Sequence, residues 1–203
     1  MGKRTCNPLA ENLKLSAECG GKMSGVGVIY FAPRDKVTRI NWELPVAPAS
    51  YEEWVTMEAA TGGTPTHAIE LSTGAKFSKL EIRLGMANLD YTVQGEAGGQ
   101  SWHAALTIDR NGFKRNTLGL QSMLLNNDVL IVAKMNNGDY HLLGDMDHGC
   151  EFDTNTAAVS GKAVTDASTN TFSFVWDANC PQIFGDQFDP ENGTGINGLD
   201  VAE

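Results

Sequence analysis

The sequence predicts a mainly β protein, a β-sandwich or barrel-like domain with one short flanking α-helix and a long inter-strand loop. Apolar residues recur with a period of two in runs of strand length, as in residues 102–108, where the apolar positions are Trp102, Ala104, Leu106 and Ile108. Turn-forming pairs such as Asn111-Gly112 separate successive runs, which favours hairpins in series. A chain of 203 residues is long enough for one sizeable core and short for two full domains.

The first element is a polar stretch, residues 1–22, which we interpret as an extended arm leading into the fold. Residues 24–42 then carry two runs rich in β-branched and aromatic residues on either side of the turn at 33–35. This arrangement predicts a β-hairpin over 24–42.

A long connection follows, from Glu43 to Pro65, and it contains three prolines. Inside it, residues 51–60 predict a short helix, with Ser50 as N-cap and two glutamates in the first turn, where they favour the positive end of the helix dipole. Connections of this length in compact domains are commonly functional or disordered. We therefore interpret the segment as an interaction loop, with a mobile surface loop as the alternative.

Strand patterns return at His67 and continue to Asn111, and they predict hairpins rather than βαβ units. Residues 116–126 differ, because their leucines and methionine lie near helical spacing. We expect one helix of about ten residues there, with Asn116 or Thr117 as N-cap and Asn126-Asn127 as its end.

Further strands are expected from 129 to 176, with turns at 136–139 and 147–149 and a last strand pair at 158–165 and 171–176. Residues 185–203 are rich in glycine and acidic side chains, and we interpret them as a C-terminal tail that is mobile or ordered by a partner. The predicted single β-sandwich domain is therefore 23–184.

The chain carries 15 Lys and Arg against 25 Asp and Glu, a formal net charge of −10. This balance argues against a surface that clamps nucleic acid, because phosphate contacts come from clustered basic side chains. The sequence has no secretion-signal pattern and no apolar run of membrane-spanning length, so we expect a soluble protein with no membrane partner. The cysteines form no CxxC pair and are expected to be reduced thiols, with a Cys6–Cys19 bridge as the alternative.

No hydrolase, zinc-protease or P-loop motif occurs, so we expect no enzyme, no cofactor and no metal. The stretch 193–198 matches GxGxxG in letters but follows no strand and opens no helix. Residues 144–151 place two aspartates, a histidine, a cysteine and a glutamate close together, which permits a metal site. The same residues are favoured in tight turns, and a turn is the preferred interpretation.

The order of these features along the chain is similar to that in a known family of proteins. A strand with the Asn137-Gly138 turn leads into Tyr140-His141-Leu142-Leu143-Gly144, an acidic turn at 145–149, a hairpin with Gly161-Lys162, and a last aromatic strand from Phe172 to Pro181. In this order the chain resembles the major tail tube proteins of long-tailed bacteriophages, particularly those of phages and prophages of Bacteroidetes-like hosts. The resemblance covers residues 23–184.

The resemblance implies a phage tail tube fold, shared with the tube protein of bacterial contractile secretion systems. Subunits would form stacked, usually hexameric rings around a channel through which viral DNA passes without specific binding, and the acidic balance suits such a wall. Partners would be other copies of the chain, the tape measure protein and the tail terminator, in the virion tail and, during assembly, in the host cytoplasm. The candidate ring-stacking residues lie in the long connection and directly before it; they are Trp42, Tyr51, Trp54 and Met57.

Two other interpretations stay open. One is a different phage β-sandwich protein, such as a tail terminator, a head decoration protein or a fibre-base protein. The other is a carbohydrate-binding, adhesin-like module, in which sugars stack on tryptophans; the candidates are Trp42, Trp54, Trp102 and Trp176.

Overall fold

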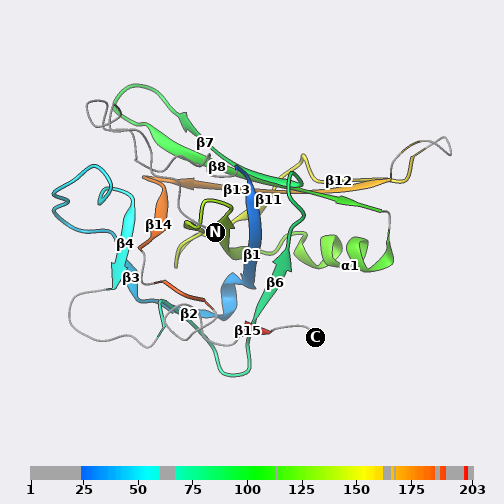
Figure 1. Ribbon diagram of the computed structural model, residues 1–203, viewed down its shortest axis with the longest axis horizontal. Coiled ribbons are helices and arrows are strands. Elements are labelled where there is room, and N and C mark those ends of the chain that lie inside the picture. The colour runs from blue at the N-terminus through cyan, green and yellow to red at the C-terminus, as the bar shows by residue number, and fades with distance from the viewer. Residues whose placement is uncertain are drawn as a thin grey trace, which may run out of the picture.

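The computed structural model describes residues 24–59, 67–112, 114–161, 166, 168–185, 188–190 and 199–200. It confirms the mainly β class: among these residues, strands dominate and a single α-helix occurs (Figure 1). The predicted arm at 1–22 lies outside the described residues.

The strands fall into three sheets. The eight-stranded sheet has the order β15-β6-β1-β9-β10-β14-β4-β3. Its strands are β1 (Val26–Pro33), β3 (Trp42–Glu43), β4 (Thr56–Ala59), β6 (Phe77–Glu81), β9 (Val129–Met135), β10 (Tyr140–Leu143), β14 (Gln182–Phe184) and β15 (Leu199–Asp200).

The five-stranded sheet has the order β11-β13-β8-β7, and β12 also pairs with β13. Its strands are β7 (Ala87–Gln94), β8 (Ser101–Asn111), β11 (Glu151–Phe152), β12 (Ala157–Val159) and β13 (Thr169–Ala178). A two-stranded sheet joins β2 (Val37–Ile40) to β5 (Ile69–Leu71), and a 3-10 turn, η2 (Arg34–Lys36), links β1 to β2.

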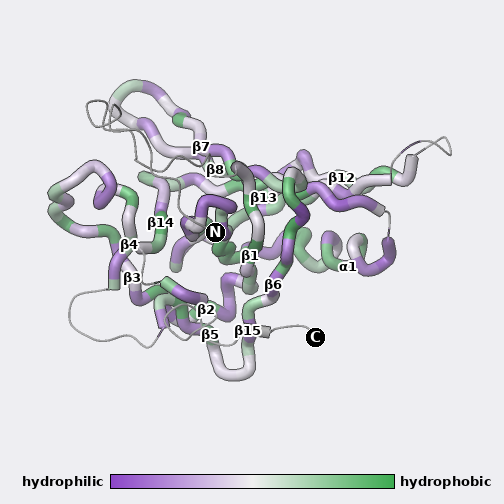
Figure 2. Tube along the Cα trace, in the orientation of Figure 1, coloured by the Kyte–Doolittle hydropathy of each residue, from purple (hydrophilic) through white to green (hydrophobic). Residues whose placement is uncertain are grey.

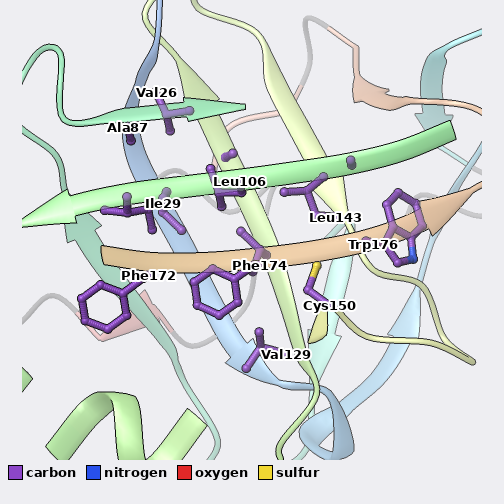
Figure 3. Packing of buried hydrophobic residues seen from close by; sticks show 14 of the residues in the cluster. Val26, Ile29, Ala87, Leu106, Val129, Leu143, Cys150, Phe172, Phe174 and Trp176 are labelled. Atoms are coloured by element: carbon purple, nitrogen blue, oxygen red, sulfur yellow. The ribbon is translucent and has the colours of Figure 1, made fainter. Parts of the chain in front are cut away.

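The two large sheets pack face to face, and their strands cross rather than run along each other (Figure 3). Aromatic side chains of β13 project from one side, and aliphatic side chains of β1 and β9 project from the other; among the residues of this sandwich core are Ile29, Leu106, Ile131, Phe172, Phe174 and Trp176. Along β8 and β13 the hydropathy colour changes from residue to residue (Figure 2), as expected where one face of a sheet is buried.

The eight-stranded sheet also buries its second face. A separate apolar cluster lies there, closed by the small β2–β5 sheet, by Phe184 at the end of β14 and by Phe188 after it. Its members include Tyr30, Trp42, Ile69, Phe77, Leu130, Val132, Phe184 and Phe188. The central strand β9 is therefore buried on both faces from Val129 to Ala133, which explains why these five consecutive residues are apolar.

The helix α1 (Arg115–Leu124) closes one end of the sandwich, where Leu124 is buried and Gln121 donates from Nε2 to the Thr171 carbonyl at 3.3 Å. The predicted helix at 116–126 is confirmed, and it ends as expected, with Asn126 at a φ of +62°. The predicted N-cap is wrong, because Lys114 occupies that position and makes no side-chain capping bond.

Several local predictions are wrong. The strands on either side of the turn at 73–74, β5 and β6, do not form the expected hairpin, because β5 pairs with β2 and β6 pairs with β1 and β15. Two further errors lie nearer the N-terminus. The expected hairpin over 24–42 does not form, because β1 pairs with β6 and β9, whereas β2 pairs with β5. The expected helix at 51–60 stops after one turn, and its second half is strand β4, which pairs with β3 and β14. In both places, pairing with distant strands outweighs a plausible local signal.

The hairpins at 87–111 and 129–143 and the pairing of β12 with β13 are confirmed. The interpretation of 185–203 as a mobile tail is wrong for its described part. Phe188 is 4% exposed and stacks on Phe184, with ring centroids 3.9 Å apart. Further on, β15 adds to β6 in parallel.

Candidate assembly surfaces

The loop between β3 and β4, residues 44–55, presents apolar side chains to solvent. Its described turn is built like a capping box: Glu53 N donates to Ser50 Oγ at 3.3 Å, and Ala49 N donates to the Glu53 carboxylate at 2.6 Å. This turn holds Tyr51 at 96% and Trp54 at 63% exposure. The loop lies at one end of the long axis, with α1 and β12 at the other (Figure 1).

The structure separates the four predicted stacking residues into two pairs. Tyr51 and Trp54 are exposed on the loop, whereas Trp42 and Met57 are 6% and 4% exposed and pack inside their own subunit. The Trp42 ring meets Phe184 edge-on at 5.5 Å. Only Tyr51 and Trp54 are therefore placed to contact another molecule, and Trp42 and Met57 support the loop from beneath.

Strand β7 forms an edge of the five-stranded sheet. It pairs with β8 from Ala87 to Gln94, and no other described strand pairs with its opposite side. An edge of this length offers a row of backbone donors and acceptors to a further strand. The sequence predicts this strand but not its place at an edge, because alternation shows which face is buried and not which strands are neighbours.

The outer face of the five-stranded sheet is polar and acidic. The register places Asp90, Ala105, Val175 and Glu151 in one row across four strands. Asp109 and Asp177 lie on the same face, by the alternation of β8 and β13. The only lysine or arginine within these described strands is Arg110, at the opposite parity.

One hydrogen bond between side chains crosses this acidic face. His103 Nδ1 lies 2.7 Å from Asp177 Oδ1, between adjacent strands. The hydrogen bond from His103 holds the pKa of Asp177 below its ordinary value, an effect that burial opposes and that a bond from Gln94 adds to. Asp177 therefore stays ionised at mildly acidic pH.

The ligand-rich stretch 144–151 forms the predicted turn. The Asp145 carboxylate accepts backbone hydrogen bonds from Asp147 at 2.7 Å and His148 at 2.6 Å, and Asp145 N donates to the His148 carbonyl at 2.8 Å. Both of these bonds go to Oδ1 of Asp145, so this oxygen is engaged with the backbone. Within the described ranges, no group of three or more His, Cys, Asp or Glu side chains is placed to hold a metal ion.

Three groups of chemical interest meet in the interior. Tyr91 and His141 form a hydrogen bond between the two large sheets, and the Cys150 thiol is buried. Burial raises the pKa of Tyr91 and of Cys150 and lowers that of His141. All three are therefore held in their neutral forms at neutral pH, which suits packing between sheets.

The tryptophans considered for sugar binding are divided as well. Trp42 and Trp176 are buried, Trp102 is half-buried, and Trp54 is the most exposed. The described part of the chain contains no helix long and apolar enough to cross a membrane.

Comparison with known proteins identifies no relative: no family model, no curated protein and no solved structure matches this chain.

Proposed function

We propose that this chain is a non-enzymatic structural subunit of a phage tail tube, which assembles with copies of itself into stacked rings. The observation that carries the proposal is the five-stranded sheet, which combines an open eight-residue edge at β7 with an acidic outer face. A sheet of this kind can continue into that of a neighbouring copy, and closure of the ring removes every open edge.

The acidic face suits a ring through which DNA passes. Asp90, Asp109, Glu151 and Asp177 lie on the side of the sheet that a closed ring turns toward its hole or toward solvent. If it lines the hole, its carboxylates repel phosphates, so viral DNA passes through the channel without adhering. The resemblance of residues 23–184 to tail tube proteins implies a ring with such a channel.

Stacking of rings is assigned to the loop at 44–55. Tyr51, Trp54 and the fully exposed Val46 present apolar side chains to solvent on this loop, which lies at one end of the subunit (Figure 1). Aromatic side chains of this kind dominate the energetics of protein interfaces when they become buried. Tape measure and terminator proteins would meet the same tube in the virion tail, after assembly in the host cytoplasm.

The test is electron microscopy of the purified protein in negative stain, beside sedimentation at rising concentration. We expect rings with a central hole and stacks of rings. In the double variant Tyr51→Ser with Trp54→Ser, we expect rings without stacks and an unchanged circular dichroism spectrum. Leu84→Ser is the matched control, because Leu84 is equally exposed, at 61%, outside the loop. A monomer at every concentration would contradict the proposal.

A carbohydrate-binding module is the second candidate, and the exposed Trp54 ring favours it. Glycan-array binding that is lost in Trp54→Ser, in a protein that forms no rings, would support this candidate. A terminator, decoration or fibre-base protein would form a ring or bind a capsid but would not polymerise into tubes.

A further inference from the structure

The end of the subunit that carries α1 and β12 contains a groove. One wall is formed by Gln121, Ser122 and Leu125 of α1 and its cap, and the other runs from the end of β11 into β12, residues 152–158. The groove is open to solvent, its exposed lining is mostly apolar, and it holds about 700 Å³ of space. This volume lies within the range of clefts that take organic ligands, about 300–1,000 Å³, so there is room for aromatic side chains. We call it the α1 groove.

Hydrogen bonds hold both walls of the α1 groove in place. Gln121 Nε2 donates to the Ala157 carbonyl at 3.5 Å, which joins α1 to β12. In the other wall, Thr156 N donates to the Asp153 carbonyl at 3.0 Å, and the Asp153 carboxylate accepts a bond from Thr154 N at 2.7 Å. The groove is therefore formed in the free subunit, so a partner can bind without the cost of ordering it.

The exposed large apolar side chains of the described residues gather at two places. Three lie on the 44–55 loop and three on the elements that form the α1 groove; the first set is Val46, Tyr51 and Trp54, and the second is Met123, Leu125 and Val159. Among the described residues, only Leu84 and Val93 lie elsewhere. The two places are at opposite ends of the long axis (Figure 1). Exposed apolar side chains that gather in this way mark interaction surfaces.

The two surfaces carry opposite charge. Residues 43–59, which contain the loop, include four glutamates and no lysine, arginine or histidine. Residues 110–127, from the end of β8 through α1, include three basic side chains and no acidic one. These three, Arg110, Lys114 and Arg115, are all exposed. The loop is therefore attracted to the surface around α1 and is repelled by a second loop.

We propose that the α1 groove of one subunit receives the 44–55 loop of a second copy of the chain. The side chains of Tyr51 and Trp54 occupy the groove, and the glutamates of the loop lie next to Lys114 and Arg115. This assignment rests on the stacking role of the loop in the proposed function, and it names the surface that the loop contacts.

The contact joins two different surfaces, so it can repeat. A subunit whose loop is bound still has an empty groove, and head-to-tail contacts of this kind continue as an open filament. A loop-to-loop contact would use the same surface on both copies and would by itself end after two rings. It would also bring Glu52 and Glu53 of both copies together, and the juxtaposition of like charges opposes binding. A tube of many rings therefore fits the pairing of loop with groove.

Complementary variants, viewed in negative stain, test this pairing. The loop variant is Tyr51→Ser with Trp54→Ser. The groove variant is Leu125→Glu, which places a negative charge at an exposed position of the groove wall. Each should form rings and lose the stacks. When the two kinds of ring are mixed after assembly, pairs of rings should appear, because the grooves of the first receive the loops of the second. The pairs should not grow, because their outer surfaces are the altered ones.

Leu84→Glu is the matched control for the groove variant. It makes the same change at a residue that is 61% exposed, against 58% for Leu125, and lies outside both surfaces. Its rings should stack as those of the unmodified protein do. Full stacking by Leu125→Glu rings, or the absence of ring pairs in the mixture, would overturn the inference.

Disulfide trapping tests the same contact in subunits that form no rings. In a background with Cys6→Ser, Cys19→Ser and Cys180→Ser, Glu52→Cys protein is mixed with isotope-labelled Ser122→Cys protein and oxidised. Mixed dimers, identified by mass, should exceed dimers of either protein with itself, because a disulfide requires Cβ atoms within about 3.5–4.5 Å of each other. Ser78→Cys in place of Ser122→Cys is the control, since Ser78 is also exposed but lies in β6. Equal yields with the two serine positions, or a majority of Glu52→Cys dimers with themselves, would overturn the inference.

The two experiments separate this inference from the proposed function. Stacked rings in the unmodified protein, without specific trapping between Glu52→Cys and Ser122→Cys, would overturn the inference and leave the tube in place. Specific trapping in a protein that forms no rings would support the contact and contradict the tube.

Discussion

Tyr91 and His141 join the two large sheets directly, with the phenol oxygen of Tyr91 3.1 Å from His141 Nδ1 and the ring centroids 5.8 Å apart. Tyr91 belongs to the edge strand β7, and His141 belongs to β10 in the other sheet. The contact therefore ties an edge of one sheet to the interior of its partner. Tyr91→Phe should lower the free energy of unfolding by about 0.5–1.5 kcal/mol, measured by urea denaturation.

The stability of the fold should decrease as the pH is lowered, because of the same contact. Burial lowers the pKa of His141 below 6.5, and nearby Asp139 offsets part of that effect. The unfolded state therefore binds a proton that the folded state excludes, so stability is complete above pH 6.5 and declines as the pH drops toward the folded pKa. His141→Gln should flatten this part of the profile. His148→Gln is the control, because the His148 side chain is 82% exposed.

Phe188 should be essential for the second apolar cluster. It stacks on Phe184 and meets Trp42 and Tyr140 edge-on. Phe188→Ala should destabilise the fold by about 3–5 kcal/mol, as large-to-small changes of buried aromatics do. Val46→Ala should change stability by less than about 0.5 kcal/mol, because Val46 is fully exposed. Equal denaturation midpoints for the two variants would contradict the assignment of Phe188 to the core.

Gly119 offers a stabilising substitution. It lies inside α1, and a Cβ there meets no atom within 4 Å. Gly119→Ala should raise the free energy of unfolding by about 0.5–1 kcal/mol, because alanine restricts the unfolded chain. Gly74→Ala is the contrast: it has equal space but a φ of +84°, so it should lose about 1–2 kcal/mol. Thermal melts of both variants give the comparison.

The described thiols should differ in reactivity. Cys150 is 1% exposed, and burial raises its pKa, with nearby Asp128 and Asp145 adding to the effect. Cys180 is half-buried, and burial raises its pKa as well. In the native protein, mass spectrometry after alkylation should find Cys180 labelled slowly and Cys150 labelled only after unfolding. Rapid native labelling of Cys150 would contradict its placement in the core.

Much of the fold was predictable where the signal is local. The Asn137-Gly138 turn fixes the β9–β10 hairpin, and the spacing at 116–126 fixes the helix. The partners of β1 were not predictable. The alternation from Val26 to Ala32 shows which side chains share a face, but it does not specify pairing with β6 or β9. Similarly, Ser50 and Glu53 do make their capping contacts. The residues that follow nevertheless form strand β4, because they pair with β14.

The candidate surfaces were predictable in part. The length and prolines of the 43–65 connection pointed to the loop that exposes Tyr51 and Trp54. The burial of Trp42 was not foreseen, because it depends on Phe184 and Phe188, which lie far along the chain. Phe188 itself lies in a segment rich in glycine and acidic residues, 185–203. The average composition of this segment therefore gives no sign that one of its aromatic rings is buried.

Because β9 is buried on both faces, its consecutive residues belong to different interiors. Leu130 and Ile131 are both 0% exposed, yet the first lies in the cluster beneath β2 and β5 and the second in the sandwich core. A probe at either position therefore reports on a separate compartment. Labels placed one residue apart would show whether the layer that carries the 44–55 loop melts together with the layer that carries β7, or before it.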